Sequence, residues 1–188
     1  MATAPTTSTA SLRADSARVR ERMLAAARER LAAGDVELPM NAIAKDAGVG
    51  VGTMYRHFPT RQALLETLAT ESLEALVAQA KAAPDGMAGL TELFREALHR
   101  LLGDPSLGAV LANPTFECAE TVVLSQELAG AFLRLLDRAR ATGAIRPDVT
   151  GDDLRRLMCG VQYAVRIGGD TEAVAERYLD ILMKGLQP

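Results

Sequence analysis

Apolar residues recur at intervals of three and four along most of the chain, the spacing that places them on one face of a helix. Helices are predicted for residues 15–33, from Pro39 to Gly48, for 51–57, from Thr60 through Val77, and for 87–102, 105–112, 119–142, 150–168 and 171–186. The breaks between them contain glycine or proline, at Gly34, Gly50, Pro59, Pro84-Asp85-Gly86, Gly103-Asp104-Pro105, Asn113-Pro114, Gly143 with Pro147, and Gly168-Gly169-Asp170. No segment alternates apolar and polar residues long enough to predict a strand. The fold class is therefore predicted to be all-α, with about nine helices.

Composition supports a helical fold. Hydrophobic residues make up 48% of the 188 residues and aromatic residues 4%, with no Trp, and a balance rich in Ala and Leu suits helix packing. Residues 1–12 contain almost nothing to bury and are expected to form a disordered tail. We expect an N-terminal three-helix head at residues 13–62 and a helical body at residues 63–188.

The net charge of −3 conceals an asymmetry between these two parts. Residues 1–62 carry nine Lys and Arg against six Asp and Glu, which gives +3, and residues 63–188 carry twelve against eighteen, which gives −6. A basic head on an acidic body can bind nucleic acid at one end only. Imbalances this small are common by chance, so the charge alone favours a DNA-binding function only modestly.

Several other kinds of site lack support in the sequence. Cys118 and Cys159 lie far apart and indicate no disulfide framework, and together with His57 and His99 they lack the short ligand spacings of a zinc site. The glycines at 48, 50 and 52 follow no strand and match no phosphate-loop pattern. No arrangement of Ser, His and Asp or of Cys and His suggests a nucleophile. We therefore predict no enzyme activity, no metal and no cofactor.

The expected location follows from two further features. Residues 1–10 are small and hydroxyl-rich, without the apolar core of a signal peptide. No stretch approaches eighteen uninterrupted apolar residues, so a membrane span is not expected. A cytoplasmic protein is the resulting expectation.

The segment from Leu38 to Phe58 has the features of a helix-turn-helix, in which two short helices meet at a tight turn. Ala44 is small enough to let the second helix cross closely over the first, and Gly48 can take the positive φ that ends the first helix. Apolar side chains that can fill the core between these helices and the preceding one are Ile43, Val49, Met54 and Phe58.

That core leaves an outer face suited to DNA. The residues predicted to bind DNA are Gly50, Val51, Gly52, Thr53, Tyr55, Arg56 and His57, with Thr60 and Arg61 at the start of the next helix. Thr53 can bond a base edge or a phosphate, and the Val51 methyl groups can touch a thymine methyl. The side chains of Tyr55, His57 and Arg61 suit phosphates, which set register without reading sequence. The alternative for Tyr55 and His57 is that they simply cover the edge of the core.

These residues resemble the TetR family of repressors. The resemblance rests on Ile43-Ala44-Lys45-Asp46-Ala47-Gly48-Val49, on Gly52-Thr53-Met54-Tyr55-Arg56-His57-Phe58 and on Thr60-Arg61-Gln62-Ala63-Leu64, and with the preceding helix it covers roughly the first third of the chain. Two positions depart from the family pattern: Leu38 stands where Thr or Ser usually caps the helix, so Pro39 substitutes, and Arg61 replaces a Lys. The glycine spacing resembles a sub-group common in high-GC actinobacteria.

The resemblance implies more than the motif alone. It implies a homodimer whose last two helices form a four-helix bundle with their counterparts, and a body that covers a ligand pocket between the middle helices. It also implies that a small-molecule effector changes the separation of the two heads, which then no longer match successive major-groove turns about 34–36 Å apart. The expected function is ligand-released repression at a palindromic operator in double-stranded DNA.

The body also contains residues that can line such a pocket. The predicted set is Phe94, Leu98, Leu101, Phe116, Cys118, Phe132, Met158 and Gln162. Arg166 is a further polar candidate. For any single apolar residue among them, ordinary core is the competing interpretation, and the sequence does not choose between the two.

Two apolar stripes near the C-terminus are candidates for a dimer interface. The first contains Leu154, Leu157, Val161 and Val165, and the second contains Val174, Tyr178, Ile181 and Leu182. Both stripes can equally be buried within one subunit. If both stripes were buried within one subunit, two terminal helices this apolar would need more of the remaining sequence to cover them than there is.

Two other functions stay open at this point. One is a helical small-molecule-binding protein whose head no longer binds DNA, which the acidic body and the missing cap at Leu38 slightly favour. The other is an all-α enzyme, which would require convergent ionisable residues in the body, and none are evident. Selection of bound DNA fragments discriminates the first from a DNA-binding regulator.

Overall fold

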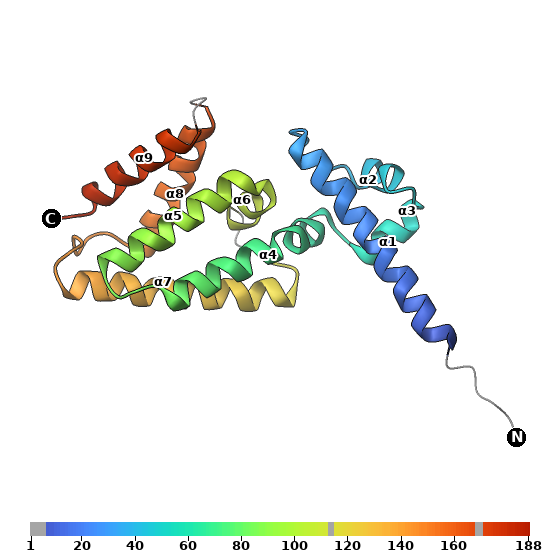
Figure 1. Ribbon diagram of the computed structural model, residues 1–188, viewed down its shortest axis with the longest axis horizontal. Helices are drawn as coiled ribbons and strands as arrows, with labels where there is room; N and C mark the ends of the chain where they lie inside the picture. The colour runs from blue at the N-terminus through green and yellow to red at the C-terminus, as the bar shows by residue number, and fades with distance from the viewer. Residues whose placement is uncertain (1–6, 113–114, 168–170) are drawn as a thin grey trace, which may run out of the picture. The chain divides into compact units, whose positions relative to one another are not determined.

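The computed structural model describes residues 7–112, 115–167 and 171–188 of the chain, and within these ranges it contains nine helices and no strand (Figure 1). The helices are α1 (Thr7–Ala32), α2 (Met40–Asp46), α3 (Val51–His57), α4 (Arg61–Ala82), α5 (Met87–Gly103), α6 (Pro105–Ala112), α7 (Ala119–Ala141), α8 (Gly151–Arg166) and α9 (Thr171–Gly185). The predicted all-α fold class is confirmed.

The start of α1 differs from the prediction. Helix α1 begins at Thr7 rather than near Asp15, so residues 7–12 are helical and the expected disordered tail is wrong for them. Residues 11–18 are exposed, which explains why no apolar pattern indicated the helix there. Ala, Leu and Arg nevertheless favour helix, and nothing before Gly34 ends it. Residues 1–6 and the predicted breaks at Asn113-Pro114 and Gly168-Gly169-Asp170 lie outside the described residues.

The chain divides into two compact units, one that ends at Leu68 and one that begins at Ala69. The boundary falls inside α4, whose first residues belong to the first unit and whose remainder belongs to the second. We call the first unit the head and the second the body.

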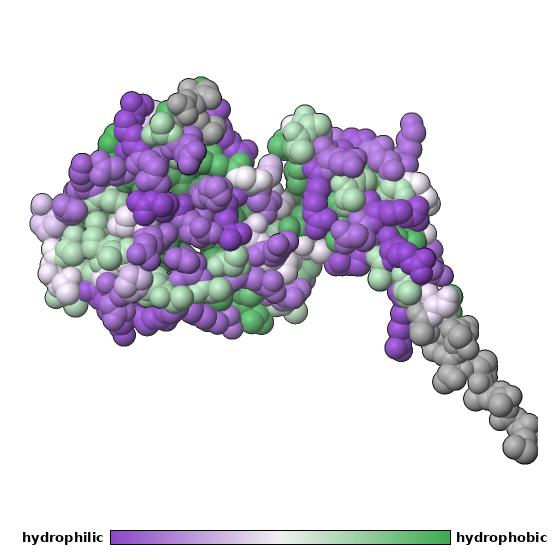
Figure 2. Space-filling model, in the orientation of Figure 1, coloured by the Kyte–Doolittle hydropathy of each residue, from purple (hydrophilic) through white to green (hydrophobic). Residues whose placement is uncertain are grey.

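The core of the head is built from one face each of α1, α2, α3 and the start of α4. Its fully buried side chains include Met23, Ala27, Ile43, Met54, Phe58 and Leu64. The guanidinium carbon of Arg20 lies 5.0 Å from the centroid of the Phe58 ring, so an arginine on α1 covers the edge of this core. On the face of the head seen in Figure 2, hydrophilic residues cover most of the surface.

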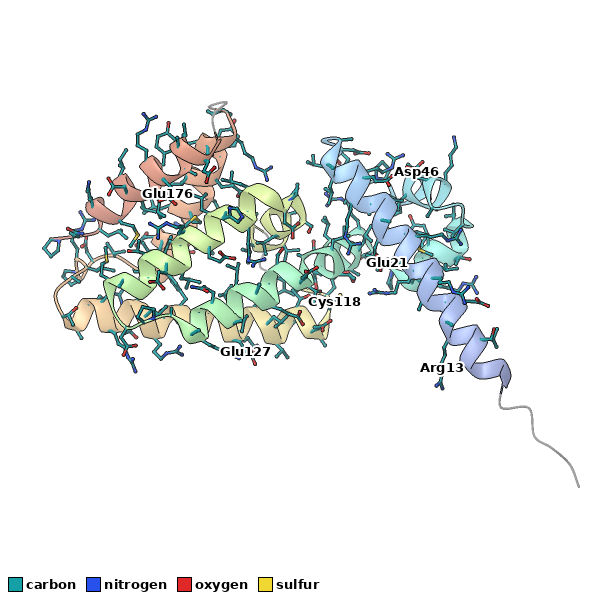
Figure 3. All side chains as sticks on the ribbon, in the orientation of Figure 1. Arg13, Glu21, Asp46, Cys118, Glu127 and Glu176 are labelled. Carbon is teal, nitrogen blue, oxygen red and sulfur yellow. The ribbon has the colours of Figure 1, made fainter. Side chains whose placement is uncertain are left out.

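In the body, α5 packs against α6, α7, α8 and α9. Fully buried leucines form its core: Leu90, Leu107, Leu135, Leu136 and Leu154. The turn before α5 lies so close that a Cβ on Gly89 would be 1.7 Å from the carbonyl oxygen of Pro84, and only glycine fits there. Exposed ion pairs join Lys81 to Glu127 at 2.8 Å and Arg95 to Glu176 at 2.9 Å (Figure 3). Pairs this exposed add little stability.

Helix α8 begins with a capping box. The hydroxyl of Thr150 accepts a hydrogen bond from the backbone N–H of Asp153 at 3.1 Å, and the Asp153 carboxylate accepts one from the backbone N–H of Thr150 at 2.9 Å. These bonds, first from the Thr150 hydroxyl and then from its backbone, hold the pKa of Asp153 below its ordinary value. In the described ranges, no helix combines the length and apolar character that crossing a membrane requires.

Candidate DNA interface and ligand cavity

The turn between α2 and α3 has the geometry that the sequence predicts. Gly48 adopts a φ of +63°, in the left-handed region that favours glycine. The chain then turns back, and the backbone N–H of Val49 donates to the carbonyl of Ala44 at 2.9 Å. Gly50 has extended φ and ψ, and α3 starts at the next residue. The predicted role of Gly48 as the helix-ending residue is confirmed.

Side chains from both helices meet beneath this turn. Ile43, Ala44 and Met54 have no exposed surface, Phe58 is buried, and Val49 is half-buried. This apolar layer fixes α3 against α2 and α1 and leaves the other face of α3 to solvent. The predicted core of the motif is confirmed.

The solvent-facing side of α3 carries most of the predicted DNA-binding residues. Gly50, Val51, Gly52, Tyr55 and Arg56 are exposed, while Thr53 and His57 are half-buried. Val51 and Tyr55 are one helical turn apart and therefore lie on the same face. Helix α3 contains Arg56 and His57 but no acidic residue, so nothing on the helix itself repels phosphate.

Arg56 lies along the surface of its own helix. Its Nε donates to the carbonyl of Gly52 at 3.2 Å, and its terminal nitrogen donates to the Thr53 hydroxyl at 3.1 Å. The guanidinium is thus placed beside Thr53, and the positive charge lies at the N-terminal half of the exposed face. A phosphate near Thr53 would meet this guanidinium without a large movement of the side chain.

Thr60 and Arg61 hold the junction between α3, α4 and the segment before α2. The Thr60 hydroxyl accepts from the backbone N–H of Ala63 at 3.0 Å, so Thr60 caps the start of α4. Arg61 donates from Nε to the carbonyl of Glu37 at 2.7 Å and from a terminal nitrogen to the carbonyl of Val36. Arg61 therefore has a structural role that the sequence did not indicate, and the residue is exposed.

Leu38 is a core residue that the sequence pattern did not identify. Its side chain has no exposed surface, and its φ of +47° lies in the left-handed region, which costs a non-glycine residue about 1 kcal/mol. Its backbone N–H donates to Asp35 Oδ1 at 3.3 Å. Pro39 is the N-cap of α2 and no side chain caps the helix, as the sequence predicted.

Arg30 on α1 ties the head together through two carboxylates. Its Nε donates to Asp46 Oδ2 at 2.6 Å, at the end of α2, and its terminal nitrogen donates to Asp35 Oδ2 at 2.7 Å (Figure 3). The hydrogen bond to Asp46, followed by that to Asp35, raises the pKa of Arg30 above its ordinary value. The guanidinium thereby anchors the helix-turn-helix to α1.

The body contains a partly open cavity of about 610 Å³, lined by residues of α4, α5, α6, α7 and α8 and by Phe116 before α7. Six of the predicted pocket residues line it: Phe94, Leu101, Phe116, Phe132, Met158 and Gln162. The predictions for Leu98 and Cys118 are wrong. Leu98 is buried in the body but is not one of the residues that line the cavity, and neither is Cys118, the half-buried N-cap residue of α7.

The cavity also contains polar residues that the sequence did not indicate. These are Ser125, Gln126, Asp152, Arg155 and Cys159. The Arg155 guanidinium pairs with the Asp152 carboxylate at 2.7 Å. Gln162 Nε2 donates to the carbonyl of Leu101 at 3.0 Å, and a terminal nitrogen of Arg166 donates to the same carbonyl at 2.9 Å. Within the described residues, no group of three or more His, Cys, Asp or Glu is arranged to hold a metal ion.

The two C-terminal apolar stripes are only partly exposed. Leu154 and Val165 have no exposed surface, so placing them in a dimer interface was wrong: they are turned inward and belong to the core of the body itself. Leu157 and Ile181 are exposed, and the other predicted interface residues, Val161, Val174, Tyr178 and Leu182, are half-buried. Two further apolar residues of this region, which the prediction did not include, are Tyr163 and Ile167, exposed by 69% and 72%.

Sequence models of two protein families match the chain. The model described as "Bacterial regulatory proteins, tetR family" matches residues 23–68, and the model described as "Transcriptional regulator SbtR-like, C-terminal domain" matches residues 85–188. The first match contains the helix-turn-helix, and the second contains α5 to α9. None of the curated proteins matches the chain.

Solved structures of bacterial regulators resemble this chain over most of its length. The TetR transcriptional regulator SCO0520 from Streptomyces coelicolor is 30% identical, with 90% of this chain and 98% of that chain covered and a TM-score of 0.53. A regulatory protein of the tetR family from Rhodococcus RHA1 is 16% identical (90% and 97% covered, TM-score 0.63). The TetR-like regulator LfrR from Mycobacterium smegmatis, solved in complex with proflavine, is 23% identical (91% and 97% covered, TM-score 0.54). The last two show a shared fold.

Proposed function

The chain belongs to the TetR family of transcriptional regulators, and we propose that it is a homodimeric repressor released from a palindromic operator by a small molecule. Members of this family are DNA-binding transcriptional regulators rather than enzymes. The proposal rests on the combination of two features in one chain. Helix α3 of the helix-turn-helix is exposed and contains no acidic residue, and the body has an apolar cavity of about 610 Å³.

In the proposed complex, α3 lies in the major groove with its N-terminal residues against base edges. Gly52 lets the helix backbone approach closely, while Val51 contacts a thymine methyl and Thr53 bonds a base edge or a phosphate. Tyr55, His57 and Arg61 hold the flanking phosphates and set the register. The surface exposure of Val51 and Tyr55 on one face of α3 supports this arrangement.

The proposed dimer covers an apolar surface on α8 and α9. Leu157, Tyr163 and Ile167 on or next to α8 and Ile181 on α9 are large apolar residues that remain exposed in the single chain. A contiguous exposed apolar patch is typical of an interaction site. A second copy of the chain, related by a two-fold axis, would cover the same surface on both subunits and present two α3 helices to two half-sites.

The proposed effector binds in the body cavity. Its volume lies in the range of pockets that enclose drug-sized molecules, and its wall is almost entirely apolar. The complex of LfrR with proflavine supports the idea that a related regulator takes a small molecule. Binding would favour a conformation of the dimer in which the two α3 helices no longer match the operator.

Selection from a random duplex library with the purified protein tests the proposal. We expect an enriched sequence with two inverted half-sites one helical turn apart, and we expect Tyr55→Phe to bind the same sequence more weakly. A control is Arg28→Ala, which changes an exposed residue on α1 that pairs with Glu21 on the same helix. Absence of any enriched sequence would favour a ligand-binding protein whose head does not bind DNA.

A further inference from the structure

We propose that the effector is an uncharged, largely apolar molecule that contains an aromatic ring and carries a hydroxyl group. This inference rests on the proposed function, because it names the chemical class of the molecule that the body cavity takes. Three features of the cavity support it: the pairing of its charged groups, the hydrogen-bond acceptor that Gln162 places in its wall and the aromatic side chains that line it.

The charged groups of the cavity already neutralise one another. Asp152 and Arg155 are the charged residues that line it, and both side chains are about half exposed. Asp152 pairs with Arg155 at 2.7 Å and with Arg156, through its other oxygen, at 2.7 Å. A carboxylate or ammonium on the effector would therefore have to leave water for an apolar wall or break an existing pair. Both costs select against a charged molecule.

One side chain of the wall is positioned to accept a hydrogen bond. Gln162 Nε2 is engaged with the carbonyl of Leu101 at 3.0 Å, which fixes the orientation of the amide. Its Oε1 has no hydrogen-bond partner among the residues that the structure describes. Gly108 leaves space for this amide, since a Cβ at that position would lie 2.9 Å from Nε2. An acceptor with a fixed orientation in an apolar wall matches a single hydroxyl or N–H donor on the ligand.

Aromatic rings form part of the remaining wall. Phe94 on α5 and Phe132 on α7 have ring centroids 5.9 Å apart with their planes inclined by 57°. Both line the cavity, as does Phe116. A planar aromatic ring can pack against such inclined faces and edges with more contact than an extended alkyl chain can. Together with Gln162, these rings indicate a phenol-like molecule.

Equilibrium dialysis of the full-length protein with three matched probes tests the inference without DNA. The probes are 2-naphthol, 2-naphthoate and naphthalene, which share a ring system and differ in the hydroxyl and the charge. We expect 2-naphthol to bind at least about 30-fold more tightly than 2-naphthoate, because Arg155, the cation that lines the cavity, is already paired with Asp152. We expect it to bind about 3- to 10-fold more tightly than naphthalene, through one hydrogen bond.

Variants locate the hydrogen bond. Gln162→Leu should remove the preference for 2-naphthol over naphthalene and leave naphthalene binding unchanged. Arg166→Leu is the matched control, since Arg166 donates to the same Leu101 carbonyl but does not line the cavity. It should leave the binding of both probes unchanged. Gln162→Met is a second variant, to be used with circular dichroism if the leucine variant unfolds.

Equal binding of 2-naphthoate and 2-naphthol overturns the inference, and so does the absence of binding by all three probes up to their solubility limits. Loss of the hydroxyl preference in Arg166→Leu to the same extent as in Gln162→Leu also overturns it. Release of DNA is measured separately. If 2-naphthol binds as expected but leaves the selected duplex bound, the ligand class stands and ligand-released repression is wrong. If 2-naphthoate releases the duplex instead, the repressor stands and the ligand class is wrong.

Discussion

The hydroxyl of Ser72 donates to Asp104 Oδ2 at 2.6 Å, and Oδ1 of the same carboxylate accepts from the backbone N–H of Ser106 at 2.9 Å. Asp104 thus caps the start of α6 and also forms a hydrogen bond with Ser72 of α4. Gly108 and Leu111 of α6 line the cavity. Because α4 also carries the last residues of the head, this carboxylate joins the wall of the cavity to the helix that continues from the head.

This link predicts an effect on ligand response. Ser72→Ala should bind DNA and 2-naphthol as the wild type does, but require a several-fold higher ligand concentration for half-release of the duplex, because one contact between α4 and α6 is lost. Thr91→Val, which removes a hydroxyl bond within α5, is the control. Fluorescence anisotropy of a labelled duplex measures the release. A release curve identical to that of the wild type would show that the Ser72–Asp104 contact has no part in the response.

Leu38 is predicted to be a main source of stability in the head. Leu38→Ala removes a fully buried side chain and should lower the free energy of unfolding by about 2–5 kcal/mol. Urea unfolding followed by circular dichroism measures the change. Val36→Ala, an exposed apolar residue two positions away, is expected to change it by less than about 0.5 kcal/mol. Equal effects of the two substitutions would contradict the core role of Leu38.

The proposed phosphate contacts predict a specific salt dependence. Arg61→Ala should weaken DNA binding across sequences and reduce the slope of log K against log salt by about one for each subunit. Tyr55→Phe should weaken binding with an unchanged slope, because it removes a hydrogen bond and no charge. Both are measured by titration at several salt concentrations. If Arg61→Ala leaves the slope as it was, Arg61 serves only its contacts with the carbonyls of Val36 and Glu37.

The apolar surface of α8 and α9 predicts a position-specific effect on assembly. Ile181→Asp places a charge in the proposed interface, at a residue exposed by 59%, and should shift the protein from dimer to monomer. Val123→Asp on α7, at a residue exposed by 53%, is the matched control and should stay dimeric. Light scattering after size-exclusion chromatography measures the mass. A monomeric wild type, or a dimeric Ile181→Asp variant, would contradict the proposed interface.

The capping box of α8 predicts a stability difference at low pH. The hydrogen bonds from Thr150 lower the pKa of Asp153 below its ordinary value of 3.8. The stabilisation is therefore fully present above the pKa of the unfolded chain and is lost as the pH falls through the lower pKa of the folded state. Asp153→Asn should be less stable than the wild type above about pH 5, and the gap should narrow as the pH falls from the ordinary carboxyl pKa toward the lower pKa of the folded state. Thermal unfolding between about pH 2.5 and 7 checks this, and a gap that persists at the acid end would refute it.

Periodicity was sufficient to predict most of the fold and the core of the helix-turn-helix. Ile43, Met54 and Phe58 recur at helical spacing. Gly48 stands at the tight turn between the two helices, where the backbone has a positive φ that glycine adopts readily. The start of α1 was missed because residues 11–18 bury nothing, so no apolar pattern marks them as helical. Leu38 was missed because its left-handed backbone places it outside any helix pattern.

Burial within one subunit and burial between subunits leave the same pattern in a sequence. Leu154 and Val165 therefore looked like interface residues, although they pack inside the body. The same ambiguity applies to the cavity. Five of the six predicted residues that line it lie on helix faces that turn inward, and Phe116 lies in the segment before α7. Leu98 lies on the same helix as Phe94 and Leu101 but is buried in the body without lining the cavity. Contacts between distant residues, such as Arg30 with Asp46, leave no local signal.

In the proposed complex, the two α3 helices of a dimer bind the two halves of a palindromic operator. Titration of the purified protein into the selected duplex, and into the same duplex with one half-site scrambled, tests it most directly. We expect two chains per duplex and a loss of at least about 100-fold in affinity when one half-site is scrambled, because one recognition helix then has only nonspecific contacts. Equal affinity for both duplexes, or one chain bound per duplex, would contradict the claim.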